Sequence, residues 1–435
     1  MLVNSLSAAL HRRGLHYAWL IAALAFLVML TTSAALGLPG AFLVPLQREH
    51  GWNTDEVASV LAVRFALFGL MAPFSAMLIE RIGMRGVVTA ALLLIAAGMG
   101  LATQATALWQ LFVAWGLLLG LGSGMTALVL AAVVANRWFC ARRGLVIGIL
   151  TASAATGQLA FLPLAAWLIE NVGWRSAVLP VMAACAGLSV LAWIFLRDRP
   201  ADLGLAPYGD PQPTATGAQA GTMPPRMALS APFLALRDAA GNRVFWLLAG
   251  SFFICGLSTN GLIQTHFIPL CGDFGLGPVP AASVLAMMGA FDLVGTVLSG
   301  WLSDRYDSRK LLFWYYGLRG LSLLWLPHST FSLYGLSLFA AFYGLDWIAT
   351  VPPTVKLAGA TFGSRLAPMV FGWIFAAHQL GAAVAAYGAG LSRTLLLTYS
   401  PALYVAGAAC FIAALLSLGA GPRTAAVAGA SAARA

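Results

Sequence analysis

Long apolar stretches separated by short polar segments make up most of this chain. A helix that crosses the hydrocarbon core of a membrane needs roughly 20 mostly apolar residues, and twelve stretches reach about that length. Their approximate bounds are 17–46, 54–79, 87–104, 107–135, 144–169, 175–196, 244–271, 280–302, 311–327, 330–354, 366–391 and 398–420. The pattern predicts an all-α membrane protein with twelve membrane-spanning helices.

One long polar segment, 197–243, separates the first six stretches from the last six. It is rich in Pro, Gly, Thr, Ala and Gln, which is the composition of a linker. We expect a short amphipathic helix near 233–238 and otherwise a plain tether, with a regulatory site as the alternative. The expected domains are an N-terminal bundle, 1–196, the linker, and a C-terminal bundle, 244–435, that includes a short tail.

The two sets of six repeat one another at an offset of 224 residues. Ala58-Ser59-Val60-Leu61-Ala62 returns as Ala282-Ser283-Val284-Leu285-Ala286, and the charged run that begins at Glu80-Arg81 returns at Asp304-Arg305. Because a charged motif and an apolar run share one register, chance is a poor explanation. Internal repeats decide architecture, so we expect two pseudo-symmetric six-helix bundles.

Composition and charge support this class and add an orientation. The chain is 60% hydrophobic and only 9% charged, too few charges to cover a soluble protein of this size. Nineteen of the Lys and Arg residues fall in the loops and tails of one side and three in the loops of the other. Because the cytoplasmic loops of membrane proteins carry an excess of Lys and Arg, this asymmetry predicts cytoplasmic N- and C-termini in a plasma (inner) membrane. The formal charge of +10 belongs to loops, and no nucleic-acid partner is expected.

The repeated loop resembles the signature of a known family. Gly300, Ser303, Asp304, Arg305, Tyr306, Arg309 and Lys310 are similar to the loop motif of the major facilitator superfamily, and Glu80, Arg81 and Arg85 give a weaker match in the first half. The resemblance covers essentially the whole chain. It implies the major facilitator fold and a transporter that works by alternating access.

Further motifs resemble one branch of that family. Gly120-x-Gly122-x-Gly124, Trp138-Phe139, Arg142-Arg143-Gly144, Gly173-Trp174-Arg175 and Arg199-Pro200-Ala201-Asp202 look like the monocarboxylate-transporter and oxalate:formate-antiporter branch. Two cations that hold anions in monocarboxylate transporters are absent: Thr296 stands where an Arg follows the matching Asp292, and the Lys of the first span would fall near Gly40. The resemblance implies an organic-anion carrier, and these departures leave a simple monocarboxylate unsupported.

Charged residues within apolar spans are candidates for the transport site, because a charge inside a bilayer costs several kcal/mol. Arg64 and Asp292 lie about twelve residues into the second and eighth spans. We expect Arg64 to hold an anionic group and Asp292 to take up a proton; interdomain contact or helix support is the alternative. His378 lies in the middle of the eleventh span, where it can serve the site or act as a hydrogen-bonded packing group.

Two spans carry interruptions at corresponding places, which point to the binding site of a transporter. The seventh span holds Gly261, which we expect to break the helix locally, and the first span holds Gly37, Pro39 and Gly40. We expect substrate contacts from the polar residues Asn260, Gln264 and His266 around Gly261, and a weaker one from Gln158 in the fifth span.

The remaining charges have other expected roles. Arg319 and Asp346 lie at similar depths in the ninth and tenth spans and are expected to neutralise each other as a structural ion pair. The loop residues are expected to gate the transporter, with solvated loops as the alternative. These are Glu80, Arg81, Arg85, Asp304, Arg305 and Arg309.

Together these patterns predict a secondary active transporter, not an enzyme, because no nucleophile–base pair, metal cluster or phosphate loop is evident in the sequence. The expected cargo is a small organic anion, monocarboxylate-like, moved by proton symport or by exchange. Alternatives are an efflux carrier for amphipathic drugs or metabolites and a non-transporting membrane sensor. No cofactor and no metal is expected; the partners are a small-molecule substrate, protons as candidate coupling ions and the lipid bilayer, and a monomer is expected to suffice.

Overall fold

The computed structural model describes residues 2–126, 129–210 and 230–421, and helices account for nearly all of the described chain. A short helix α1 (Leu2–Arg12) precedes the first bundle and was not expected from the apolar pattern. The first half consists of α2 (Tyr17–Gly37), η1 (Leu38–Phe42), α3 (Leu43–His50), α4 (Thr54–Ile82), α5 (Met84–Ala102), α6 (Leu108–Leu111), η2 (Phe112–Leu119), α7 (Gly120–Met125), α8 (Val129–Trp138), α9 (Arg143–Asn171) and α10 (Trp174–Phe195).

The second half repeats this order after the linker, which contains η3 (Pro200–Leu203) and α11 (Ala231–Ala240). Its elements are α12 (Arg243–Gly256), η4 (Leu257–Gln264), α13 (Thr265–Asp273), α14 (Pro278–Arg305), α15 (Ser308–Trp325), η5 (Leu326–His328), α16 (Leu333–Asp346), α17 (Val351–Leu396) and α18 (Ser400–Leu418). The offset of 224 residues carries the start of α4 onto the start of α14 and the start of α5 onto that of α15, so the sequence repeat is a repeat of helices.

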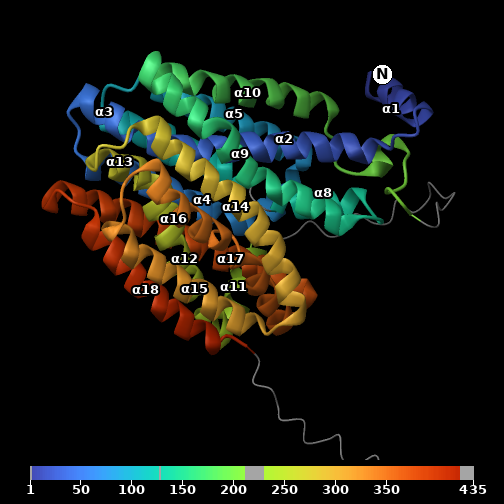
Figure 1. Cartoon of the computed structure of the whole chain (residues 1–435). Coiled ribbons are helices and arrows are strands. Elements are labelled where there is room, and N and C mark those ends of the chain that lie inside the picture. Colours follow the sequence, from blue (N-terminus) through green and yellow to red (C-terminus); the bar gives the residue numbers. More distant parts are fainter. Residues whose placement is uncertain (1, 127–128, 211–229, 422–435) are drawn as a thin grey trace, which may run out of the picture.

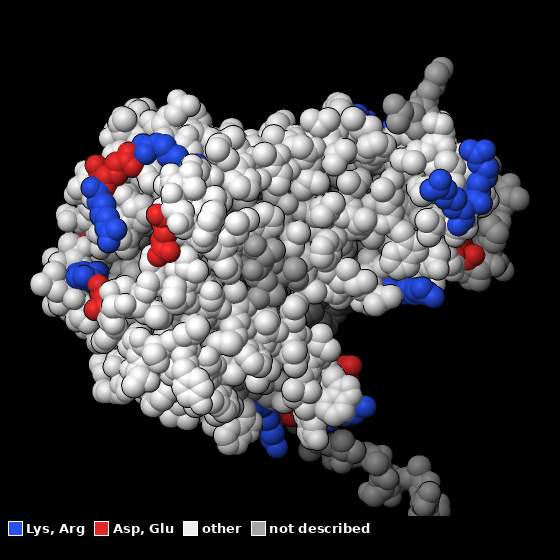
Figure 2. All heavy atoms as spheres, turned by 45° about the horizontal axis from the view of Figure 1, so that its top comes forward, with Lys and Arg blue, Asp and Glu red and all other residues white. Residues whose placement is uncertain are grey.

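The helices are long and apolar enough to cross a membrane. Ten helical segments of the described chain meet that condition, and α9 and α15 occupy the positions of the two remaining expected spans. Figure 2 shows Lys, Arg, Asp and Glu gathered near two opposite ends of the molecule, with an uncharged belt between them. The prediction of an all-α membrane protein with twelve spans is confirmed.

The tenth span differs from its expected bounds. The apolar run ends near Thr354, but the helical segment of this span continues to Gly363, where a φ of 73° ends the helix before the eleventh span begins. Lys356, expected in a loop, therefore lies on a helix. Hydropathy measures how much of a helix matches the hydrocarbon core, and a helix can extend beyond that core with polar side chains.

The two halves form two lobes (Figure 1). Most buried apolar side chains of the first half form one cluster, and those of the second half form two others. The halves meet along two seams, α4 against α17 and α9 against α14. The domain boundaries drawn from the sequence stay a prediction.

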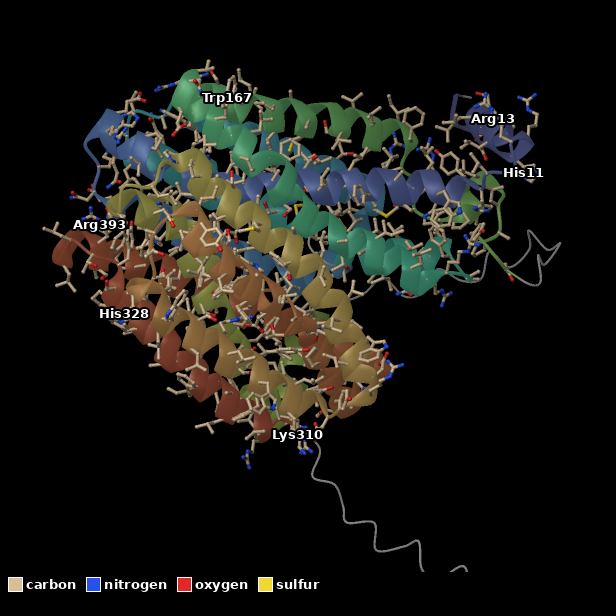
Figure 3. All side chains as sticks on the ribbon, in the orientation of Figure 1. His11, Arg13, Trp167, Lys310, His328 and Arg393 are labelled. Atoms are coloured by element: carbon tan, nitrogen blue, oxygen red, sulfur yellow. The ribbon has the colours of Figure 1, made fainter. Side chains whose placement is uncertain are left out.

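The halves pack more closely at one end than at the other. At the end away from α1, Thr394 donates to the Asp55 carboxylate at 2.8 Å, and Ala41, Leu162 and Ala166 of the first half join a core cluster of the second. At the end that carries α1, Figure 2 shows the surface hollowed between the two lobes. In Figure 3, His11 and Arg13 lie at this end of the first half, whereas Arg393 and His328 lie at the opposite end of the second half.

The linker helix α11 bridges the two halves. Its Phe233 ring lies 5.3 Å from Phe74 of α4 and 6.1 Å from Trp373 of α17, and the Trp373 indole N–H donates to the Pro232 carbonyl at 2.8 Å. The expected short amphipathic helix is therefore present. Its apolar face is anchored on both lobes, so this part of the linker is more than a tether.

Candidate functional site

A cavity of about 180 Å³ lies between the two halves. Residues from both halves line it; half of them are polar, although most of the lining surface is apolar. The first half contributes Met29, Thr32, Ser33, Leu36, Phe65, Phe68, Ser123, Thr126 and Thr151. The second half contributes Phe252, Cys255, Thr259, Asn260, Gln264, Leu285, Gly289, Asp292, Trp347, Ile348, Thr350, Val351, Phe375, His378 and Gln379. Four of the expected site residues are among them.

Asp292 is the one carboxylate among the described lining residues, and its side chain is nearly buried. Helix α14 presents it to the turn between α16 and α17, where the Ile348 backbone N–H donates to Oδ1 at 2.8 Å. The Thr296 hydroxyl, one helical turn away, donates to the same oxygen at 3.0 Å. Thr296, which stands where the monocarboxylate transporters carry an Arg, is therefore an uncharged hydrogen-bond donor to the Asp292 carboxylate.

His378 lies in the wall of the cavity contributed by α17. Its ring packs beside Phe252, with ring centroids 4.8 Å apart, and stacks on Phe375 at 5.8 Å. Its Nδ1 is buried and has no hydrogen-bond partner among the described residues. Gln379, the next residue, is 1% exposed and its Oε1 also has no partner there.

The seventh span is deformed but not broken. Residues Leu257–Gln264 form a π-helical segment, and Asn260 and Gln264 on it reach the cavity. The expected break at Gly261 is wrong: a side chain there would collide with the Ala382 carbonyl of α17, so Gly261 serves close helix packing within a continuous helix. π-helical turns inside longer helices are frequent at functional sites.

His266 does not reach the cavity. Its Nε2 lies 2.8 Å from the Ala386 carbonyl oxygen, and its ring packs against Tyr399. The expected substrate contact is therefore replaced by a packing role. The interruption of the first span is present as η1, whose Gly40 approaches the backbone of Gln264 so closely that a Cβ would lie 2.8 Å from that carbonyl oxygen.

Arg64 lies behind the lining of the first half. Its guanidinium donates from Nη1 to the Leu36 carbonyl at 2.9 Å and lies over the Phe65 ring, 4.4 Å from the centroid. Both of those residues line the cavity. The side chain is 1% exposed, and its Nε has no hydrogen-bond partner in the described part of the chain. The structure therefore places Arg64 one layer from the cavity.

Three further expected residues lie elsewhere or have side chains that are not described. Gln158 falls on α9, and its side chain lies outside the described residues. Arg319 and Asp346 lie together, with Nε 2.6 Å from Oδ2, and the other guanidinium nitrogens donate to Cys255 Sγ at 2.9 Å and to the Asp346 and Trp347 carbonyls at 2.5 Å and 3.2 Å. Cys255 and Trp347 line the cavity, so this buried pair supports its wall from behind.

The loop motif of the first half makes contacts within that half. Glu80 forms an ion pair with Arg137 at the end of α8 and lies 4.0 Å from Arg199. The Arg85 guanidinium lies over the Trp193 ring, 4.0 Å from its centroid, and the Arg85 backbone N–H donates to Asp198. Arg81 lies at the end of α4. The acidic residue thus holds the end of the fourth span.

The second motif makes an equivalent contact. Asp304 lies 3.9 Å from Lys356 Nζ, on the helical extension of the tenth span, and Arg305 lies over the Trp301 ring. Arg309 pairs with Asp307 at 2.7 Å, and its guanidinium holds the pKa of that carboxyl below the usual value. In each half the acidic residue contacts a cation of the next-but-one span, and none of the contacts described for these residues joins the two halves.

Several lining residues were not expected from the sequence. Cys255 and Thr259 are four residues apart on the seventh span, and Phe375 and Gln379 flank His378 on the eleventh. The signal that could have found them is helical spacing, because residues three or four apart share a helix face. The aromatic lining gave no such signal, since aromatic residues occur throughout the apolar spans.

Comparisons with known proteins agree with this architecture. Residues 21–386 match the Major Facilitator Superfamily. The chain is 28% identical over 395 residues to monocarboxylate transporter 13 of Rattus norvegicus, covering 90% of this chain and 86% of the relative. It is 26% identical to monocarboxylate transporter 12-B of Danio rerio, with 92% and 86% covered.

A bacterial relative extends the same result. The chain is 23% identical to the uncharacterized MFS-type transporter YcxA of Bacillus subtilis (strain 168), with 80% of this chain and 82% of that protein covered. The predicted resemblance to a transporter superfamily and to its monocarboxylate-transporter branch is confirmed, and the chain is a membrane transporter rather than an enzyme. The chain belongs to the major facilitator superfamily.

Proposed function

We propose that this protein is a secondary active transporter that carries a small organic acid across the plasma (inner) membrane by alternating access, with both termini in the cytoplasm. Relatives named monocarboxylate transporters support a carboxylate-bearing cargo. The cavity supports a small one, because about 180 Å³ is comparable with the engineered cavity of roughly 150 Å³ that binds benzene.

The observation that carries the proposal is a pair of unbalanced charges beside the cavity. Arg319 and Asp346 neutralise each other, but Arg64 and Asp292 make no ion pair within 4.0 Å in the described part of the chain. One lies in each half, and each is nearly buried. Burying an unpaired charge costs several kcal/mol, so both sites are suited to a charged cargo. The free Nε of Arg64 suits a carboxylate.

The charge of Asp292 sets how transport is driven. When both ends of the carrier close around the cavity, this carboxylate loses access to water and needs a proton or a cationic group beside it. Proton symport and exchange are the two modes that follow, and both give Asp292 a coupling role. Arg64 reaches the cargo after a small movement of Phe65 or Leu36, the two residues that separate its guanidinium from the cavity.

Alternating access is supported by the unequal packing of the two ends. The halves pack against one another at the end away from α1, and the surface is hollowed at the end that carries α1 (Figure 2). With the termini in the cytoplasm, the cavity belongs to an inward-facing state. The loop motifs then act as gating devices, because each holds the end of a span that must move when the carrier closes.

An efflux carrier for amphipathic compounds is the second candidate. The aromatic lining, with Phe65, Phe68, Phe252 and Trp347, favours it. The size of the cavity favours a small acid instead, because drug-sized ligands occupy pockets of roughly 300–1,000 Å³. Export of drugs from loaded vesicles, with no uptake of any organic acid, is the result that selects this second candidate.

Replacing Arg64 tests the proposal directly. In proteoliposomes we expect Arg64→Gln to lower uptake of labelled organic acids about tenfold or more, because a charge-assisted hydrogen bond contributes about 1.5–3 kcal/mol. The melting temperature should fall little, because the variant loses the contacts with Leu36 and Phe65 but also removes a buried charge that has no carboxylate partner. Arg237→Gln, on an exposed side chain of α11, is the control. Unchanged uptake with a lower melting temperature would instead make Arg64 a structural residue.

Replacing Glu80 tests the gating role. Its ion pair with Arg137 is partly exposed, so Glu80→Gln should change the free energy of unfolding by only about 0–1 kcal/mol. We expect slower uptake nevertheless, because the end of the fourth span loses its anchor in one state. Asp238→Asn, which removes an exposed carboxylate that contacts Arg237, is the matched control. Equal uptake rates for the two variants would refute the gating role.

A further inference from the structure

The charges of the cavity lining do not match a simple anion. Among its described lining residues, Asp292 is the one charged side chain, and no Lys or Arg is present. A carboxylate cargo without another charge would meet a carboxylate of the same sign across an apolar space. Like charges in such surroundings repel strongly, so the second-half wall is suited to a positively charged group.

Asp292 is oriented for a ligand. The Ile348 N–H and the Thr296 hydroxyl both donate to Oδ1, at 2.8 Å and 3.0 Å, and no described residue donates to Oδ2. Because one donor is a backbone group, this orientation does not depend on a flexible side chain. One oxygen of the carboxylate is thus held by the protein and the other is available to the cargo.

Two more buried polar atoms of the same wall lack a partner, one of them an amide oxygen that can only accept. Gln379 Oε1 and His378 Nδ1 are buried and have no partner in the described chain, and both residues line the cavity. Leaving a buried acceptor without a donor costs about 1–3 kcal/mol. An ionised carboxylic acid brings acceptors only, whereas a cationic nitrogen group brings N–H donors to meet Asp292 and Gln379 together.

Aromatic rings surround these acceptors. Phe252, Trp347 and Phe375 line the second-half wall, and Phe65 and Phe68 face it from the first half. The face of an aromatic ring attracts a cation, by about 2 kcal/mol or more where water is excluded. Rings beside a carboxylate are the surroundings in which proteins hold organic cations.

The first-half wall has the complementary chemistry. Ser123 Oγ is buried and unpartnered among the described residues, and Thr32 and Thr126 hydrogen bond to each other beside it. These hydroxyls can donate to a carboxylate, and the guanidinium of Arg64 contacts Leu36 and Phe65 of the same half. The two halves therefore differ in charge beside the cavity, with the Asp292 carboxylate in the second-half wall and the Arg64 guanidinium next to the first-half wall.

We propose that the cargo is a small zwitterion, an organic acid that also carries a cationic nitrogen, whose nitrogen binds Asp292 and Gln379 between aromatic rings while its carboxylate faces Ser123 and Arg64. This inference rests on the proposed function and narrows its substrate class. The cationic nitrogen of the cargo then balances the charge of Asp292, and its carboxylate balances that of Arg64. The two ends of the cargo thereby link the two halves of the protein. A plain acid carried with a proton on Asp292 leaves Gln379 without a donor.

Matched sets of compounds test the inference on the unmodified protein. Short ω-amino acids are each compared with the unsubstituted acid and the amine of equal chain length; γ-aminobutyrate, butyrate and butylamine form one set. Uptake into proteoliposomes and thermal shift of the purified carrier are measured for each. We expect a zwitterion to bind about tenfold more tightly than its matched acid.

The outcomes separate this inference from the proposed function. If the plain acids are taken up and every zwitterion binds equally or less, the zwitterion proposal is overturned and the organic-acid carrier stands. If no acid of either kind binds or moves, or if the amines alone do, both proposals fail. The variant Asp292→Asn should lose the preference for the zwitterion and keep binding of the plain acid; Asp238→Asn is its control, and a preference that survives in Asp292→Asn also overturns the inference.

Discussion

Replacing Arg319 with Leu is expected to destabilise the protein by about 3–5 kcal/mol, the cost of leaving a buried charge without its partner. The side chain is 1% exposed, and its guanidinium makes an ion pair with Asp346 and donates to two backbone carbonyls. In Arg319→Leu the carboxylate and both carbonyls lose their donor at once. Low yield of folded protein and a large fall in melting temperature are the expected measurements.

The double variant Arg319→Leu with Asp346→Leu should be less destabilised than either single variant. A buried ion pair replaced by apolar residues of similar volume is often neutral or stabilising, because both desolvation costs disappear. Melting temperatures of the two single variants and the double variant in one detergent form the cycle that measures the coupling. Additive losses would show that the two residues act independently.

Exchanging the two residues should not restore stability fully. The Arg319 guanidinium also donates to the carbonyls of Asp346 and Trp347 and to Cys255 Sγ, and these contacts depend on an Arg that projects from α15. An Arg placed at 346 starts from the other helix and cannot reach the same acceptors. Recovery of the full melting temperature in the exchanged variant would contradict this geometry.

The sequence predicted the architecture well because its determinants are local or repeated. Each span needs only enough apolar residues, and the offset that joins Ala58 to Ala282 already paired the helices of the two halves. What it predicted poorly is the exact extent of helices at polar ends, as at Lys356. There the helix is stabilised by packing and hydrogen bonds, which a hydropathy pattern does not report.

The lining of the cavity was predicted in part. Asp292, His378, Asn260 and Gln264 stand out in the sequence because polar residues are costly inside a membrane; all four line the cavity, and their roles in transport stay predictions. His266 met the same criterion, but its ring turns to a carbonyl of α17. Arg64 met it too and lies one layer behind the cavity. Hydropathy indicates how deep in the membrane a residue lies. Whether its side chain points into the cavity or toward another helix depends on which helices pack beside it.

Glycines at the crossing of α12 and α17 explain why the His378 side chain lies in the wall of the cavity. A Cβ on Gly256 would collide with the His378 carbonyl, and one on Gly381 would collide with the Phe253 carbonyl. The two contacts are reciprocal, so the helices touch backbone to backbone, as small residues allow in membrane bundles. This close approach brings His378 beside Phe252, in the wall of the cavity.

A methyl group at Gly381 is therefore expected to force the two helices apart. We expect Gly381→Ala to lower the free energy of unfolding by about 1–3 kcal/mol, the usual cost of overpacking, and to reduce uptake because His378 and Gln379 move with α17.

The matched control is Gly388→Ala on the same helix, where a Cβ meets nothing within 4 Å. There Ala should be neutral or stabilising, since Ala favours a helix over Gly by about 1 kcal/mol. Melting temperature and uptake rate of the two variants, measured in parallel, decide the point. Equal behaviour of Gly381→Ala and Gly388→Ala would mean that the crossing can widen without cost, and the position of His378 would then need another cause.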